Sequence, residues 1–304
     1  MADTKKIAIA QAPFDDHNCD IILRSANGVD FHVFKLILSL VSPVFKDMFA
    51  LPQGESQSNI SSVPVITVTE SSTTLDSLLL LCYPAATPTF GSFNDAKAVM
   101  EAASKYDMQT ALGRAGDLVM AQFLSHRCLD LYAVSCQFGW PHHARTAATR
   151  SLEIKDLGRP SHMFNGIRDI SALDLHRLLD YHYKCGIAAQ AVGSSLSWLE
   201  PSHKPMQMWK DCTCKPDVGV KLQKNFGNVY VTSLFHEYLV FSGKKLLARP
   251  CESTLLSELS HYNRVITDAT ECSSCRSTVV EDMHNFRALY ISRVKKVIAA
   301  IEGV

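Results

Sequence analysis

The chain has 304 residues, of which 47% are hydrophobic and 20% charged, and its formal net charge is zero. This composition excludes a disordered chain, which needs low hydrophobicity and high net charge, and it gives no basic excess for nucleic acid. The longest apolar stretch, Leu78–Cys82, is far too short to cross a bilayer. We therefore expect a globular protein that binds neither nucleic acid nor membranes.

The N-terminus and the cysteines indicate in which compartment of the cell we expect the protein. Residues 1–13 contain no apolar run of the length found in secretory signals, so we expect the protein in the cytoplasm or nucleus. The chain has ten cysteines. In a reducing compartment these are expected to be thiols or metal ligands rather than a disulfide framework.

The first predicted structure is a β-hairpin that follows a flexible leader over residues 1–17. Residues 20–25 form an apolar, β-branched run, and residues 29–33 alternate with the two-residue period of a half-buried strand. Between them lies Asn27-Gly28, the strongest short hairpin signal.

Helical periodicity follows the hairpin. Apolar residues recur at helix spacing over 34–41, and Ser42-Pro43 supplies an N-cap followed by proline at the first helical position. Small and polar residues over 51–62 predict a surface loop. The pattern of the next residues predicts a strand over 63–68 and helices over 71–82, 94–106 and 110–124.

After Arg127 strand signals become scarce and helices dominate. The charge balance changes at this point, from 8 Lys/Arg against 13 Asp/Glu before it to 22 against 17 after it, which supports two separate units. The last predicted helix, 277–301, has apolar residues every three or four positions, which predicts a core-facing stripe. The other helices are predicted over 129–138, 141–152, 171–183, 186–199, 230–247 and 254–265.

Three segments of the first unit carry a family resemblance. They are Asp20-Ile-Ile-Leu23, Phe31-His-Val-Phe-Lys35 and Leu38–Phe49 (LSLVSPVFKDMF). Their order and spacing resemble the BTB/POZ family, whose signature is an aromatic-His-hydrophobic-x-Lys strand end followed by a Ser-x-x-Phe-x-x-Met-Phe helix. The resemblance covers about residues 15–126 and implies a protein-binding module with a small sheet and helices. Within it we interpret His32 as structural rather than as a general base, because no nucleophile or acid lies at useful spacing.

The remainder resembles the helical extensions that follow BTB domains, such as the BACK region. Leu131–Trp140 and the predicted helix after it carry that resemblance. More narrowly, Leu178–Gly186, Ser197-Trp-Leu199 and two cysteine pairs look like BTB proteins of mushroom-forming fungi.

Together these observations predict an α+β chain: a leader over 1–17, a BTB/POZ domain over 18–126 and a mainly α-helical, BACK-like domain over 127–304. The BTB module is expected to present a binding surface to a protein partner, and the helical domain to recognise something else. The chain is thus interpreted as a non-enzymatic adaptor.

Two departures from the family pattern bear on the partners that the resemblance implies. BTB domains that form swapped homodimers usually begin with an additional helix and strand, whereas the stretch before Asp20 is short and interrupted by Pro13. The sequence therefore leaves open whether the protein forms a homodimer.

The second departure concerns cullin binding. BTB adaptors of cullin ubiquitin ligases often carry a hydrophobic-x-Glu motif, but no glutamate lies between Glu70 and Glu101. This absence argues against cullin binding.

The cysteine pairs are the one constellation with metal-binding chemistry. Four thiolates, those of Cys212, Cys214, Cys272 and Cys275, can complete a tetrahedral zinc shell. His182 and Cys185, one helical turn apart, are alternative ligands. Two interpretations carry equal weight, one structural zinc ion or four reduced thiols, and a redox disulfide between Cys272 and Cys275 is a minor third.

Catalytic motifs are absent from the sequence. It contains no GxxxxGK[ST] or GxGxxG loop, no GxSxG elbow and no HExxH motif. The rival hypothesis is a metal-dependent enzyme that uses the C-terminal half, where nine of the twelve histidines lie. A closed four-sulfur site would favour a structural metal, whereas three ligands and an open position in a cleft would favour catalysis.

Overall fold

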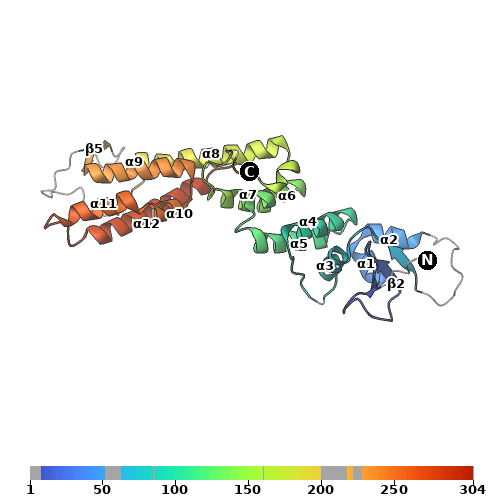
Figure 1. Cartoon of the computed structure of the whole chain (residues 1–304). Helices are drawn as coiled ribbons and strands as arrows, with labels where there is room; N and C mark the ends of the chain where they lie inside the picture. The colour runs from blue at the N-terminus through green and yellow to red at the C-terminus, as the bar shows by residue number, and fades with distance from the viewer. Residues whose placement is uncertain are drawn as a thin grey trace. The chain divides into compact units, whose positions relative to one another are not determined.

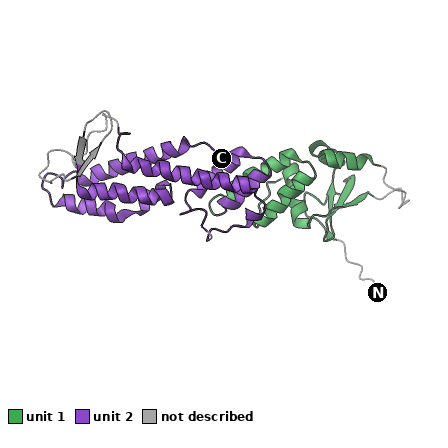
Figure 2. Cartoon of the chain, turned by 90° about the horizontal axis from the view of Figure 1, so that it is seen from above, with its two compact units in different colours: residues 1–126 green, residues 127–304 purple. Residues whose placement is uncertain are grey.

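The structure is a computed structural model that describes residues 8–51, 63–84, 86–159, 161–199, 218–221 and 228–303. The chain forms two compact units, residues 1–126 and 127–304 (Figure 2). The division falls next to Arg127, where the charge balance of the sequence changes.

A four-stranded sheet forms one part of the first unit. The predicted hairpin is confirmed: β2 (Ile21–Arg24) pairs antiparallel with β3 (Val29–Val33), and Gly28 in the turn has a φ of 84°. Glycine suits that position because at a positive φ the Cβ of any other residue would clash with the backbone, and glycine has none. The third predicted strand, β4 (Val65–Thr67), pairs parallel with β2. With β1 (Ala8–Ile9) the sheet order is β1-β3-β2-β4.

The structure differs from the expected flexible leader over 1–17. Within it β1 (Ala8–Ile9) pairs in parallel with β3. Phe14 is fully buried, and its ring lies 5.8 Å from that of Phe31 and 5.3 Å from that of Tyr83. These contacts join residues that are distant in sequence, so local periodicity does not show them.

Helices pack against the sheet in the first unit (Figure 1). They are α1 (Lys35–Val41), α2 (Pro43–Ala50), α3 (Ser72–Cys82), α4 (Phe93–Lys105) and α5 (Gln109–Phe123). The side chains of Ser42, Ser71 and Ser92 accept a hydrogen bond from the backbone N–H three residues later, which caps α2, α3 and α4. The loop predicted over 51–62 lies outside the described residues, apart from Leu51.

The core of the first unit lies between the sheet and these helices. Its fully buried apolar side chains come from both layers: Ile21, Leu23, Val33, Leu38, Phe45, Leu75, Leu78, Leu79 and Met100. The alternating strand residues and the apolar stripes of the helices therefore meet as their periodicities predict.

The second unit is mainly helical. Its helices are α6 (Cys128–Gln137), α7 (Pro141–Ser151), the 3-10 helix η1 (Asn165–Arg168), α8 (Ala172–Ser194), α9 (Ser233–Ala248), α10 (Glu252–Ser257), α11 (Leu259–Thr270) and α12 (Val279–Ala299). The predicted stripe of α12 is buried at Val279, Met283, Phe286, Tyr290 and Val294. In the last turn the prediction is wrong, because Ile298 is buried, whereas Val297 and Ile301 are only half-buried. None of the helices in the described ranges is both long and apolar enough to cross a membrane.

Three predictions for the second unit are wrong in detail. The two helices predicted over 171–183 and 186–199 are one helix, α8, which runs through Gly186 and ends at Ser194. The helix predicted over 254–265 is two helices, since Glu258 has a non-helical ψ of 80°. A hairpin of β5 (Val218–Lys221) and β6 (Asn228–Val231) was not predicted at all.

Glycines bring α8 and α9 close together. A Cβ on Gly186 would lie 2.5 Å from the carbonyl oxygen of Leu247, and one on Gly193 would lie 2.9 Å from that of Leu239. Real Cβ atoms do not approach backbone oxygens so closely, so both positions require glycine in this packing. Gly186 is therefore needed for the contact between α8 and α9, and α8 continues through it.

Candidate protein-binding site

The predicted zinc ligands are only partly described. Cys212 and Cys214 lie outside the described residues. Cys272 and Cys275 lie in the turns between α11 and α12, where the carbonyl of Cys275 accepts from Val279 N at 3.0 Å. Cys275 is buried. Within the described part of the chain, no group of three or more His, Cys, Asp or Glu residues could hold a metal ion.

The alternative ligands His182 and Cys185 are held by their surroundings. His182 is buried, its Nε2 lies 3.0 Å from the carbonyl oxygen of Ile154, and burial lowers its pKa. Burial raises the pKa of Cys185 to about 11, which keeps it a thiol at neutral pH. Both side chains are buried, and they belong to no group of three possible metal ligands among the residues that the structure describes.

His32 is also a structural residue in its surroundings. Its side chain is buried at the sheet, and its Nδ1 lies 3.2 Å from the carbonyl oxygen of Asp16. The ring of His17 packs edge-on against it at 5.9 Å. The ring therefore ties the segment before β2 to β3.

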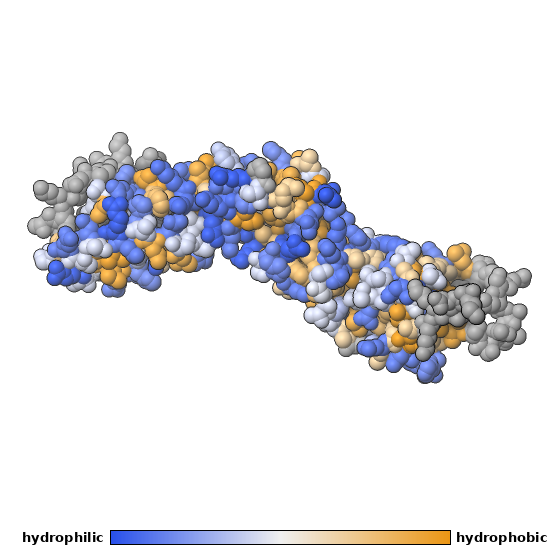
Figure 3. Space-filling model, in the orientation of Figure 1, coloured by the Kyte–Doolittle hydropathy of each residue, from blue (hydrophilic) through white to orange (hydrophobic). Residues whose placement is uncertain are grey.

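The first unit exposes apolar side chains on α1 and α2. Leu36 and Leu40, one helical turn apart on α1, are 70% and 77% exposed. Val44 in the first turn of α2 and Leu51, the residue that follows its last turn, are also exposed. We call these four residues the α1–α2 apolar face. Apolar residues reach the surface among hydrophilic ones in both units (Figure 3).

Buried residues on the opposite sides of α1 and α2 anchor both helices in the core. Leu38 of α1 and Phe45 of α2 are fully buried, so each helix is anchored by its inner side. The helical periodicity predicts Phe34, Ile37, Leu38 and Val41 on the inner stripe of α1, and it predicts Val44 in the core. The prediction for Val44 is wrong, because its side chain is 36% exposed. The leucines outside that stripe were the available signal for an exposed apolar face.

The start of α2 is held by hydrogen bonds. Ser42 Oγ accepts from Phe45 N at 3.0 Å and donates to the carbonyl oxygen of Tyr106 at 2.5 Å. The rings of Phe45 and Tyr106 stack at 4.5 Å. One residue thus caps α2 and joins it to the end of α4.

Tyr106 continues this network to the sheet side of the unit. Its hydroxyl donates to Glu70 Oε2 at 2.6 Å, and Lys105 Nζ lies 2.7 Å from Glu70 Oε1. Burial raises the pKa of Tyr106. Burial alone would raise the pKa of Glu70, but hydrogen bonds from Lys105 and Tyr106 lower it overall. The network thus joins the start of α2, through Tyr106, to Glu70 beyond the end of β4.

The fold of the first unit agrees with a comparison against known families. Residues 11–118 match the family model of the BTB/POZ domain. No curated protein matches the chain significantly. The chain therefore has an N-terminal BTB/POZ domain followed by a mainly helical region. BTB/POZ domains are protein–protein interaction modules, so the exposed apolar face is the candidate site for that role.

Proposed function

We propose that this chain is a non-enzymatic protein-binding protein whose BTB/POZ domain self-associates through the α1–α2 apolar face. The observation that carries this proposal is the exposure of Leu36 and Leu40 on a helix whose other side is anchored in the core. Burying a leucine side chain contributes about 1.5–3 kcal/mol. Covering this face with an apolar partner would therefore stabilise a complex.

A second copy suits the face for an electrostatic reason. From Leu36 to Val41, α1 has no charged residue. In a two-fold contact the same patch occurs on both sides, so charged patches would repel each other whereas an apolar patch is complementary to itself. The sequence left a homodimer open, and the face supplies a surface for one.

Sedimentation velocity over a range of protein concentrations tests the proposal. We expect the unmodified chain to form a dimer and the double variant Leu36→Glu/Leu40→Glu to remain a monomer. Both leucines are exposed, so the far-UV circular dichroism spectrum and the melting temperature should stay unchanged. Leu173→Glu/Val280→Glu is the matched control, because both residues are more than half exposed and belong to the second unit.

Two results would contradict the proposal. One is a monomeric unmodified chain at every concentration. The other is equal dimerisation of the Leu36→Glu/Leu40→Glu variant and the control variant.

The cysteine pairs support a second, structural proposal. We propose that Cys212, Cys214, Cys272 and Cys275 bind one zinc ion that connects the residues before α12 to the middle of the second unit. A Cys-x-x-Cys turn is a common half of a zinc site, and Cys272 and Cys275 lie in such a turn. A four-sulfur shell would stabilise the fold without an open position for catalysis.

A further inference from the structure

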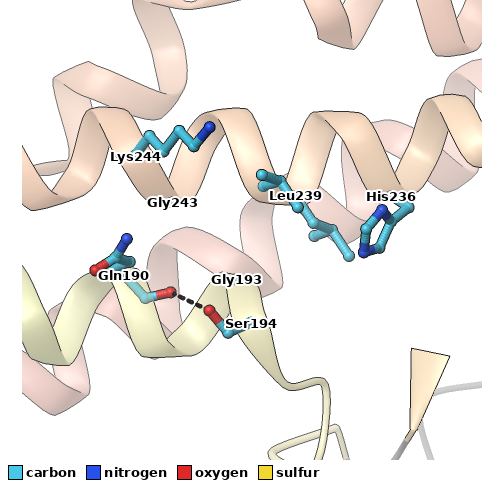
Figure 4. Close-up of a pocket in the computed structure, with 8 residues that line it drawn as sticks. Gln190, Gly193, Ser194, His236, Leu239, Gly243 and Lys244 are labelled. Carbon is cyan, nitrogen blue, oxygen red and sulfur yellow. Dashed lines mark hydrogen bonds between the residues drawn. The ribbon is translucent and has the colours of Figure 1, made fainter.

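A hollow lies between α8 and α9 in the second unit. It has a volume of about 210 Å³, and Figure 4 shows the residues that line it. Its lining comes from both helices: Gln190, Gly193 and Ser194 from α8, and His236, Leu239, Val240, Gly243 and Lys244 from α9.

Two glycines line this hollow. At Gly193 the two helices are in close contact, because an added Cβ would lie 2.5 Å from the Tyr290 hydroxyl and 2.9 Å from the Leu239 carbonyl oxygen. At Gly243 the nearest atom to an added Cβ would be the Gln190 carbonyl oxygen at 3.4 Å, which is an ordinary contact. Gly243 therefore leaves room between α8 and α9 that Gly193 does not.

The hollow is apolar at its base. Leu239 is buried there, and Val240 is 43% exposed beside it. Ser194 Oγ donates to the carbonyl oxygen of Gln190 at 3.3 Å, so this hydroxyl is turned toward its own helix (Figure 4). Bringing an aliphatic group into such a depression removes apolar surface of both molecules from water.

The hollow has one cationic side chain in its lining. This is Lys244, and no ion pair joins it to a carboxylate among the described residues. The neighbouring Glu237 pairs with Arg264 of α11 at 3.4 Å. Residues 127–304 have 22 Lys/Arg against 17 Asp/Glu, so the charge of the whole unit also favours an acidic ligand.

We propose that this hollow binds one aliphatic side chain of a partner protein, with an adjacent carboxylate of the same segment facing Lys244. Cofactor and drug-like ligands usually occupy pockets of about 300–1,000 Å³, so a hollow of about 210 Å³ suits a single side chain better. The partner segment is therefore a short acidic–aliphatic peptide. This site belongs to the helical unit and is separate from the α1–α2 apolar face.

The test is a titration of the full isotope-labelled chain with two blocked dipeptides, followed by amide NMR shifts. The probes are acetyl-Leu-Glu-amide and acetyl-Leu-Gln-amide, which differ only in the carboxylate. We expect saturable shifts at Gly193 and Gly243 with both probes. The glutamate probe should bind roughly two- to fivefold more tightly, as for one exposed ion pair.

Two variants test the apolar contribution of the hollow and the charge of Lys244 separately, and a third variant serves as control. Ser194→Phe should fill the hollow and abolish the shifts, and Lys244→Glu should remove the preference for the glutamate probe. Lys296→Glu makes the same charge change at an exposed position of α12 outside the lining, and it should bind like the unmodified chain. Circular dichroism confirms that each variant is folded.

Three outcomes would overturn the proposal. They are the absence of saturable shifts at both glycines, shifts that survive Ser194→Phe, and a glutamate preference that survives Lys244→Glu. If dilution of the protein alone shifts the same glycines, the hollow instead contacts a second copy. None of these results depends on dimerisation through Leu36 and Leu40.

Discussion

The hydroxyl of Ser42 donates a 2.5 Å hydrogen bond to the carbonyl oxygen of Tyr106 while it caps α2. Ser42→Ala therefore removes a helix cap and leaves a buried carbonyl without its donor. A cap contributes about 0.5–2 kcal/mol and a buried unsatisfied group costs about 1–3 kcal/mol. We expect a loss of about 2–4 kcal/mol in the free energy of unfolding, measured by urea denaturation.

Ser71→Ala is the matched control for that variant. Ser71 caps α3 in the same way, but it is exposed. Water can replace its hydroxyl, so the loss should be smaller, about 0.5–2 kcal/mol. Equal losses for the two variants would mean that the bond to Tyr106 contributes nothing.

Glu70 predicts a pH-dependent contribution to stability. Its pKa is lower in the folded state than its ordinary value of 4.5, because Lys105 and Tyr106 donate hydrogen bonds to the carboxylate. A lowered folded pKa means that the stabilisation is present above the unfolded pKa and is lost as the pH falls through the folded pKa.

Glu70→Gln is therefore expected to destabilise the chain at pH 7 and progressively less in acid. The measurement is the difference in unfolding free energy between the two proteins, taken by urea denaturation from neutral pH to below the ordinary pKa of glutamate. A difference that is constant over this range would contradict the assignment.

Replacing Gly193 by alanine tests how tightly α8 and α9 are packed against each other. In Gly193→Ala the new Cβ would lie 2.5 Å from the Tyr290 hydroxyl and 2.9 Å from the Leu239 carbonyl oxygen. Extra methyl groups in packed cores typically cost about 1–3 kcal/mol. We expect a lower melting temperature of the second unit, measured by calorimetry.

Gly243→Ala, at the same helix pair, is the control. Its Cβ would be 3.4 Å from the Gln190 carbonyl oxygen, an ordinary contact, and alanine is favoured over glycine inside a helix by about 1 kcal/mol. This variant should be neutral or stabilising. If Gly193→Ala were equally well tolerated, the close approach of the two helices would be wrong.

The proposed zinc site predicts about one zinc ion per chain when the protein is purified without a metal-affinity tag. Elemental analysis measures the content, and a strong chelator should lower the melting temperature. Cys275→Ser should lose the metal, whereas Cys251→Ser, outside the proposed ligand set, should keep it. Metal-free protein with all four thiols reactive under native conditions would exclude the site.

Cullin binding is predicted to be weak or absent, because no glutamate lies between Glu70 and Glu101 to supply the hydrophobic-x-Glu motif. Isothermal titration calorimetry with a purified cullin N-terminal domain measures this directly. A sub-micromolar dissociation constant would show that the motif is dispensable in this chain.

Local signals in the sequence determined many elements of the fold. Asn27-Gly28 marked the hairpin, Ser42-Pro43 marked the start of α2, and the three-to-four-residue spacing after Val279 marked the buried side of α12. Each depends on residues within one turn or one helix, where side-chain period and capping act over short distances. The BTB/POZ resemblance rested on the same local features and is confirmed over residues 11–118.

Contacts between distant segments decided the rest. Pairing with β3 orders β1, and contact with α9 explains why Gly186 continues α8 rather than ending it. The exposure of Leu36 and the hollow beside Gly243 likewise depend on which neighbours cover each residue. The sequence does not distinguish a buried apolar residue or glycine from an exposed one, because burial depends on packing among segments far apart in the chain.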